Sequence, residues 1–459
     1  MKDQNQTPKR KISPKFTVPF FVVMAVLTLA SFSLTLRPTV SNSEKRELAK
    51  FPDFTWESLV SGDYFDGIST WFSDTFPGRE TWLNVASDMK SLYGSSEVMI
   101  EGDLPALETV PPIPDAPAAV DRPETHSPVQ PAPETPEAAE AAEATGETQP
   151  ERWGGVDAGD NAEILMASAV IQIGDSAFNA QGFSQIYSDD YIKTVNSFAK
   201  SMAEKDITVV SAPSPTAVGI MIEEEYLAKL NCASQDQMLR YLHAGMSDDV
   251  VKVDTVGALL PHNDEYIYFR TDHHWTALGA YYSYEAICKA LGMEPVDLDS
   301  LETWDQGEFQ GSLYGKVKNP RKLKLDTVTA YIPIGDITNT VYNQDGYGIE
   351  RDLLTDTTQR EPNTRYLVFG TDYPLTHTHN ASLPDAPNVL LVKDSFGNCI
   401  VPFMTQNFRN VYAVDYRKYW TMPLNMFVDK YDIDYVIFMP YLTATQSSQG
   451  VDLLYNVCF

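Results

Sequence analysis

The chain has 459 residues and a formal net charge of −29 at pH 7, with 63 acidic and 34 basic side chains. A single hydrophobic core rarely grows beyond about 250 to 300 residues, so we expect more than one folding unit or a large non-globular share. The acidic balance argues against binding of DNA or RNA through phosphates, because such binding needs clustered Lys and Arg.

The N-terminus has the pattern of a membrane anchor. A basic cluster at residues 9–15 precedes an uncharged, mostly apolar run from 16 to 36. At about 1.5 Å per residue this run spans the hydrocarbon core of a bilayer. The positive-inside bias predicts a cytoplasmic tail (1–15), a transmembrane anchor (16–36) and an extracytoplasmic remainder, a single-pass protein of the cell membrane. A cleaved signal peptide is the alternative, but 33–36 is a poor cleavage site.

Two different segments follow the predicted anchor. Residues 38–100 mix aromatic and polar side chains, and we expect them to be ordered and packed on the main domain, with an amphipathic helix at 79–93. From 101 to 153 the composition shifts to Pro, Glu, Ala and Thr. Such a segment cannot bury enough apolar surface to offset its ordering entropy. It is therefore predicted to be a disordered, acidic, Pro-rich linker.

Residues 154–459 alternate short apolar runs with helical segments. Strands are predicted at 168–173, 207–211, 249–254, 389–392, 410–414 and 435–439, and helices at 190–205, 235–243 and 277–291. Apolar strands without polar alternation need cover on both faces, so the pattern predicts a doubly wound parallel sheet of the α/β class. Residues 305–365 have weaker periodicity and are expected to form an insertion of loops and antiparallel strands.

The cysteines and an isolated His-x-His pair carry weaker signals. No Cys-x-x-Cys pattern indicates a zinc knuckle or a dithiol site, and the even number leaves both disulfides and free thiols open; the four are Cys232, Cys288, Cys399 and Cys458. His377 and His379 lie in a polar segment that is expected to be a solvent-exposed loop.

Acid and imidazole groups are concentrated in the motif Asp272-His-His-Trp275. Asp272 and His274 are two residues apart, so on an extended segment they point to one side and the carboxylate can orient the imidazole. His273 is then expected to point away and to make a hydrogen bond or packing contact. Thr276 is a good N-cap for the next helix. A metal site is the alternative use, but adjacent histidines rarely ligate one ion, so neither metal nor cofactor is expected.

A serine that can act with this pair lies in Lys393-Asp-Ser-Phe-Gly-Asn398. A hydroxyl between a strand and a helix N-terminus suits a nucleophile beside an oxyanion hole, and histidine is the base best matched to serine near neutral pH. The alternative is that Asp394 or Ser395 only caps the helix. Ser176, which ends another strand in Gly-Asp-Ser, is a competing nucleophile, but no late Asp-x-x-His pair accompanies it.

These motifs resemble the bacterial DHHW protein family, which is named after the motif at 272–275. They are also similar to the SGNH-hydrolase-like domain of alginate O-acetyltransferase proteins, which pair an Asp-x-His-Trp motif with a downstream serine. The resemblance extends over most of the chain outside the linker, including residues 42–46, 51–52, 74–79, 311–314 and 393–396.

The resemblance implies an SGNH-hydrolase-like fold with Ser395 as nucleophile, His274 as base and Asp272 as the orienting acid. We expect His273, Trp275 and Asn398 to support these three residues. It implies a membrane-anchored serine O-acetyltransferase or acetylesterase that acts on a cell-envelope or exported polysaccharide, with a membrane-bound O-acyltransferase as partner. The linker departs from the alginate proteins, and the sheet is expected to run to residue 459 with no evident carbohydrate-binding module after it, so the polymer identity does not transfer. The alternatives are a non-catalytic envelope protein that binds glycan or scaffolds a polysaccharide-modification complex, and a metal-dependent hydrolase.

Overall fold

The computed structural model describes residues 37–76 with gaps, 108–111, 164–167, and 170–459 except 228, 229 and 318. The predicted anchor at 16–36, the helix at 79–93 and nearly all of the linker lie outside these residues. None of the helices within the described residues combines the length and the apolar character that crossing a bilayer requires. The chain divides into two units, residues 1–98 and 99–459.

The first unit contains a short hairpin and one helix among its described residues. The strands β1 (Val40–Ser41) and β2 (Arg46–Glu47) pair antiparallel, and α3 spans Asp63–Asp74. The Arg37 guanidinium lies over the Trp71 ring at 3.9 Å and donates to Thr75 Oγ1 at 2.7 Å. These contacts hold the segment around Arg37 against the last turn of the helix.

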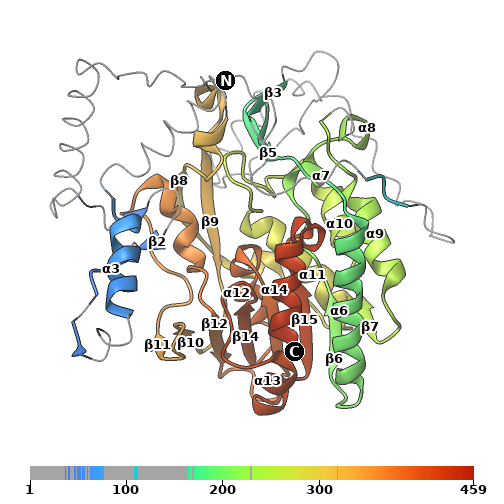
Figure 1. The fold of residues 1–459 in the computed structure, drawn as a ribbon. Coiled ribbons are helices and arrows are strands. Elements are labelled where there is room, and N and C mark those ends of the chain that lie inside the picture. The colour runs from blue at the N-terminus through green and yellow to red at the C-terminus, as the bar shows by residue number, and fades with distance from the viewer. Residues whose placement is uncertain are drawn as a thin grey trace, which may run out of the picture. The chain divides into compact units, whose positions relative to one another are not determined.

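The second unit is built around an eight-stranded sheet of order β11-β10-β12-β14-β13-β15-β6-β7 (Figure 1). Five of these strands run parallel and confirm predicted strands: β14 (Asn410–Asp415), β13 (Asn388–Lys393), β15 (Tyr435–Met439), β6 (Thr208–Ser211) and β7 (Val250–Lys252). The other three are antiparallel to their neighbours: β11 (Gly348–Glu350), β10 (Ile337–Tyr342) and β12 (Leu375–Asn380). The sheet is therefore mixed: the predicted parallel arrangement is confirmed for five strands, and three antiparallel strands extend the sheet at one edge.

Helices cover both faces of the sheet, as the doubly wound arrangement requires. On β13, Leu390 and Val392 belong to the core formed with α6, α9, α13 and α14, whereas Val389 and Leu391 belong to the core formed with α7, α10, α11 and α12. This two-sided burial explains why the strand has no polar alternation. The helices are α6 (Gln185–Ala203), α7 (Ala217–Met221), α8 (Glu224–Leu227), α9 (Gln235–Gly245), α10 (Thr255–Leu259), α11 (Ala277–Ala290), α12 (Val401–Met404), α13 (Leu424–Lys430) and α14 (Ser448–Cys458).

The predicted strand at 168–173 does not join the central sheet. Instead β4 (Val170–Ile173) lies between β3 (Ile164–Ala167) and β5 (Ser176–Asn179) in a small antiparallel sheet. Ile173 pairs with Ser176, so two residues make the turn, and Gly174 adopts a φ of +57° there. A tight turn with a left-handed glycine reverses the chain into a hairpin, so no helix can follow β4.

The predicted insertion is confirmed as antiparallel strands, although part of it extends the central sheet. The strands β8 (Glu302–Phe309) and β9 (Asp326–Ile332) form a separate hairpin, and β10 and β11 add to the sheet edge. The 3-10 helix η6 (Pro362–Phe369) follows and contacts β8. This segment supplies several side chains to the site described below.

All four cysteines are buried free thiols, and each lies within the described residues. Burial raises the pKa of the Cys232 thiol to about 11 and those of Cys288 and Cys399 to about 12. The thiols therefore behave as small apolar side chains of the core.

Candidate active site

The Asp-His-His-Trp motif forms a tight loop between η2 (Leu260–His262) and α11. Tyr268 and Trp275 pair in an isolated antiparallel bridge, and the N–H of Phe269 donates to the carbonyl of His274 at 3.2 Å. The chain therefore reverses direction within the motif, and the expected extended backbone is wrong. As predicted, Thr276 caps α11, because its Oγ1 accepts from the N–H of Gly279 at 3.3 Å.

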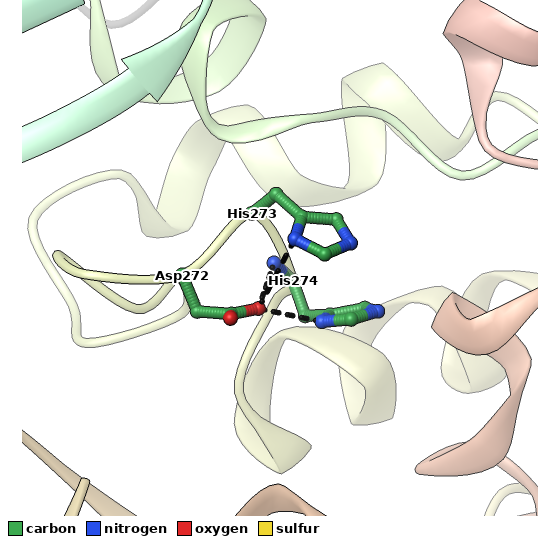
Figure 2. A group of neighbouring side chains, drawn as sticks. All are labelled: Asp272, His273 and His274. Atoms are coloured by element: carbon green, nitrogen blue, oxygen red, sulfur yellow. Dashed lines mark hydrogen bonds and ion pairs between the residues drawn. The ribbon is translucent and has the colours of Figure 1, made fainter. Parts of the chain in front are cut away.

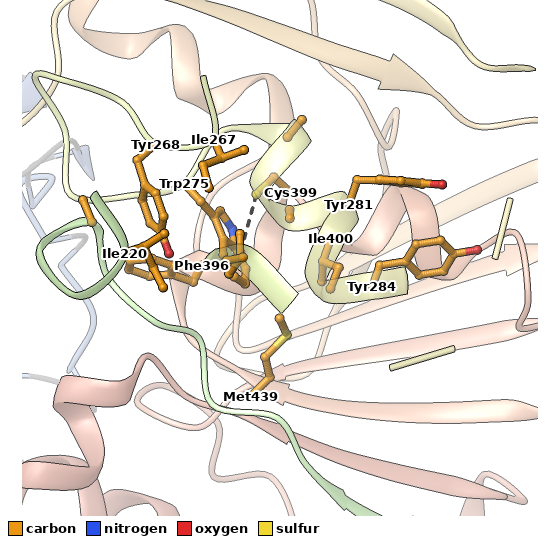
Figure 3. Close-up of a cluster of buried hydrophobic side chains, with 14 of the residues drawn as sticks. Ile220, Ile267, Tyr268, Trp275, Tyr281, Tyr284, Phe396, Cys399, Ile400 and Met439 are labelled. Carbon is orange, nitrogen blue, oxygen red and sulfur yellow. Dashed lines mark hydrogen bonds between the residues drawn. The ribbon is translucent and has the colours of Figure 1, made fainter. Parts of the chain in front are cut away.

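Buried aromatic side chains pack against this loop. Trp275 is fully buried, and its indole Nε1 donates to the carbonyl of Phe396 at 3.0 Å. The two rings also make an edge contact with centroids 5.4 Å apart, and Figure 3 shows them side by side. The indole therefore ties the loop to the residue that follows Ser395.

Asp272 reaches His274 because its carboxylate closes the bend. Oδ1 accepts from the His274 N–H at 3.1 Å and lies 2.6 Å from His274 Nδ1 (Figure 2). Oδ2 accepts from the N–H of Ser312 at 2.7 Å. An ionised carboxylate has no hydrogen to donate, so Nδ1 carries the proton and Nε2 is the basic nitrogen of His274.

Ser395 lies at that basic nitrogen. Its Oγ is 2.7 Å from His274 Nε2, although the two residues are 121 positions apart in the chain. Ser395 begins the 3-10 helix η7 (Ser395–Asn398), directly after β13 and Asp394. Ser395 is half-buried, whereas His274 is only 7% exposed. The hydroxyl is the donor in this contact, so the imidazole can take its proton.

The capping role expected beside Ser395 belongs to Asp394. Its carboxylate accepts from the N–H of Phe396 at 3.0 Å and from the N–H of Tyr441 at 2.6 Å. Burial raises the pKa of Asp394 above its ordinary value, against the effect of these bonds and of Arg417. Because Asp394 caps the turn, the hydroxyl of Ser395 is left for His274.

Asn398, predicted to support the site, joins a partly buried charged network. Its Nδ2 donates to Asp372 Oδ1 at 2.9 Å, and its Oδ1 accepts from Lys393 Nζ at 2.5 Å. Arg417 also contacts Asp372, at 2.9 Å. Burial acts to raise the pKa of Asp372, but the charges of Lys393 and Arg417 hold it below its ordinary value. The network anchors the turn that carries Ser395, and the amide of Asn398 is occupied within it.

His273 does not point away from the pair, contrary to expectation. Its Nδ1 lies 3.0 Å from Ser312 Oγ and 3.4 Å from Asp272 Oδ1, and its ring centroid lies 3.9 Å from that of His274. The reason is the bend, which removes the alternation of an extended segment. With its side chain 35% exposed, His273 is the most accessible of the three motif residues in Figure 2.

The same three residues offer one oxygen and two nitrogens within 4.8 Å of one another, a set that can hold a metal ion. The atoms are already engaged, since Asp272 Oδ1 faces the protonated Nδ1 of His274. An ion bound there would displace that proton, and the tautomer that makes Nε2 basic would be lost. Metal binding and the contact with Ser395 are therefore competing uses of the motif.

The sequence did not predict two contacts that the segment 302–369 makes with the site. The ring of Tyr366 stacks on the imidazole of His274, with centroids 4.4 Å apart and planes at 13°, and its hydroxyl donates to the carbonyl of Ser395 at 3.2 Å. Ser312 contributes its N–H to Asp272, as above. Ser312 lies in the segment 311–314 that carries part of the family resemblance, but no local pattern indicates Tyr366.

A second buried carboxylate holds the backbone that precedes Asp272. Asp326 accepts from Tyr266 Oη, the N–H of Arg270, and both the N–H and Oγ1 of Thr271, at 2.5 to 2.8 Å. Burial raises its pKa to about 6 in spite of these bonds. Gly311 packs on the same turn, where an added Cβ would lie 2.4 Å from the Thr271 carbonyl. Position 311 therefore has no room for a side chain, which explains why it is a glycine.

The competing serine has a different environment. Ser176 is fully buried on β5, and its hydroxyl donates to Asp175 Oδ1 at 2.8 Å. The neighbouring N–H of Ala177 donates to the carbonyl of Arg270 at 2.8 Å, so β5 is hydrogen-bonded to the backbone that precedes the motif. The serine that the fold brings to His274 is Ser395.

Comparisons with known proteins agree with the motif reading. A family model described as "DHHW protein" matches residues 44–124 and 139–414, which include Asp272, His274 and Ser395. No curated protein matches the chain.

Solved structures match about two thirds of the chain. A crystal structure of a DHHW family protein from Eubacterium siraeum is 25% identical, with a TM-score of 0.59, and the match covers 66% of this chain and 99% of that chain. PatB1 of Bacillus cereus is 17% identical with a TM-score of 0.50, over 63% of this chain and 99% of that chain, a likeness of fold alone.

Proposed function

The chain belongs to the DHHW protein family, and on that premise we propose that it is an extracytoplasmic serine O-acetyltransferase or acetylesterase acting on a polysaccharide. One observation carries the proposal: a continuous line of hydrogen bonds from Asp272 Oδ1 through His274 Nδ1 and Nε2 to Ser395 Oγ. Acyl transfer through a serine ester requires an orienting acid, a base and a nucleophile in contact, and Asp272, His274 and Ser395 meet this requirement in that order.

In the proposed first step, Ser395 Oγ attacks the carbonyl carbon of an acetyl ester while His274 Nε2 takes the hydroxyl proton. The positive charge on the imidazole is stabilised by Asp272 and by the Tyr366 ring stacked on it. The negative charge develops on the former carbonyl oxygen. The N–H of Ser395 is our candidate donor to it, because the first N–H groups of a helical turn have no partner within the turn.

Collapse of this intermediate breaks the ester bond, and the leaving oxygen takes the proton from His274. The acetyl group is then held on Ser395 Oγ. In the second half-reaction His274 takes a proton from a sugar hydroxyl or from water as that oxygen attacks the acetyl carbonyl. The bond from the acetyl carbon to Ser395 Oγ then breaks, and His274 returns the proton to Oγ, which regenerates the free serine. A sugar hydroxyl makes the protein a transferase, and water makes it an esterase.

The cellular setting belongs to the same proposal. The basic tail at 1–15 and the apolar run at 16–36 support a membrane anchor with the second unit outside the cytoplasm. An acetyl donor made inside the cell must then cross the membrane, which is the reason for proposing a membrane-bound O-acyltransferase as partner. The sequence resemblance to alginate O-acetyltransferase proteins supports a polysaccharide acceptor.

The test is covalent labelling by a serine-directed fluorophosphonate together with hydrolysis of p-nitrophenyl acetate. We expect labelling in the unmodified protein and in Ser176→Ala, and none in Ser395→Ala. His274→Ala should reduce both labelling and hydrolysis. Labelling lost in Ser176→Ala but kept in Ser395→Ala would show that the nucleophile is misassigned. Hydrolysis in the unmodified protein no faster than in His274→Ala would favour a glycan-binding role.

A further inference from the structure

A second convergence of polar donors lies at the opposite end of the sheet from Ser395. His377 Nε2 and His379 Nδ1 both lie 2.9 Å from one atom, Asn410 Oδ1. The two histidines belong to β12 and are partly buried, so the expected solvent-exposed loop is wrong. Asn410 is the first residue of β14, whereas Ser395 follows the last residue of the parallel neighbour β13.

The sheet itself places these donors. Residues two apart on a strand share a face, which brings both imidazoles to one side of β12. In the antiparallel register with β14, His379 pairs with Asn410 and His377 with Tyr412. The ring of His377 stacks on that of Tyr412, with centroids 4.3 Å apart and planes at 6°. Its orientation is therefore held by packing.

The amide of Asn410 is also held, and its oxygen is directed at the histidines. Its Nδ2 donates to Asn388 Oδ1 at 2.7 Å, and Asn388 Nδ2 donates in turn to the carbonyl of Asp432 at 2.7 Å. This chain of donors decides which end of the amide faces the imidazoles. Three strands and the turn before β15 thus fix two nitrogens and one oxygen in one place.

We propose that His377, His379 and Asn410 form a binding site for a divalent transition-metal ion of the Zn²⁺, Cu²⁺ or Ni²⁺ class, which would clamp β12 to β14. Imidazole is the ligand type that these ions prefer, and water completes the coordination. In a tetrahedral site with bonds of about 2.1 Å, the donors lie about 3.4 Å apart. The two nitrogen-to-oxygen separations, now 2.9 Å, would widen by about half an ångström to reach this value.

Binding changes the protonation of the imidazoles in a defined way. Each ring nitrogen that now donates a hydrogen to Asn410 must present its lone pair to the ion, so the proton moves to the other ring nitrogen. Neutral histidines therefore bind without net proton release. The ion would join β12, the first antiparallel strand of the sheet, to the parallel strands at the position where the two patterns meet.

The test measures Zn²⁺ and Cu²⁺ binding to the full chain after chelation and dialysis, by calorimetry for affinity and by electron paramagnetic resonance for nitrogen ligands. We expect His379→Gln to weaken binding more than about tenfold and to remove one coordinated nitrogen. His262→Gln is the matched control, because that histidine is also partly buried but pairs with Glu265. His273→Gln identifies any ion held by the other cluster.

Circular dichroism without metal shows whether each variant is folded. Asn410→Asp provides a second measurement in which binding is expected to become stronger, because a carboxylate oxygen at this position should tighten Zn²⁺ binding. Binding that is equal in the unmodified protein and in His379→Gln, or lost only in His273→Gln, would overturn the proposal, and so would weaker binding in a folded Asn410→Asp. Fluorophosphonate labelling of Ser395 should be the same in all variants at this site, so the outcome is independent of the proposed catalytic function.

Discussion

Replacing Asp272 with Asn tests the central arrangement, because the loop uses both carboxylate oxygens as acceptors. Oδ1 faces Nδ1 of His274 at 2.6 Å and its N–H at 3.1 Å, and Oδ2 accepts from the N–H of Ser312 at 2.7 Å. Asparagine has one oxygen and one NH₂ group, so a donor must now face either the imidazole or Ser312. The first orientation is favoured, because the only donor left without an acceptor there is the His274 N–H, which makes the longest of the three bonds.

In that orientation the amide donates to Nδ1 of His274 and moves the ring proton to Nε2. The imidazole then cannot accept the proton of Ser395, and the equivalent change in a serine protease triad lowers kcat by about 10⁴-fold. The unpaired N–H of His274 should cost about 1 to 3 kcal/mol of unfolding free energy. We therefore expect kcat for p-nitrophenyl acetate to fall by about 10³ to 10⁴-fold with KM little changed.

The measurements are steady-state kinetics and urea unfolding of the same preparations. Ser312→Ala is the matched control. It keeps the backbone N–H that donates to Asp272 and removes only the hydroxyl that is hydrogen-bonded to His273. Its kcat should stay within about tenfold of the unmodified protein. If Asp272→Asn also stayed within tenfold while remaining folded, the carboxylate would not set the tautomer and the proposed mechanism would be refuted.

Four further outcomes are expected. The pKa of Asp326 is raised from 3.8 to about 6, so its contribution to stability is full below about pH 4, and about 3 kcal/mol is lost as the pH rises through 6 to about 7. Urea unfolding of Asp326→Asn over the same pH range should lack this loss, and parallel pH curves for the two proteins would contradict the assignment. Gly311→Ala should cost about 1 to 3 kcal/mol of unfolding free energy, since its Cβ would lie 2.4 Å from a backbone carbonyl. Tyr366→Phe should retain more kcat than Tyr366→Leu, because only Phe keeps the ring on His274. Zn²⁺ should inhibit ester hydrolysis and a chelator should restore it; activation by Zn²⁺ would favour a metal-dependent hydrolase.

Local sequence was sufficient for the parallel strands of the central sheet, for α6, α9 and α11, and for the chemistry of the central residues. Apolar runs identified β13, β14 and β15 inside the sheet, because burial on both faces favours apolar side chains at successive positions of a strand. At the edge strand β7 only the pair Val250-Val251 carried this signal. The N-cap at Thr276 and the turn after β13 were also readable, since both depend on residues within a few positions. Asp272, His274 and Ser395 were picked out because few side-chain types can act as acid, base and nucleophile.

Only the tertiary structure decided which of these groups meet. The predicted strand at 168–173 went to a separate sheet because a two-residue turn with Gly174 in the left-handed region reversed the chain. The direction of His273 depended on a bend that is stabilised by Asp326, which lies more than fifty residues away. Periodicity reports how much of a residue is buried and not what it is buried against. The ring of Tyr366 on His274 and the shared amide oxygen of Asn410 are pairings of that kind, and no local pattern contains them.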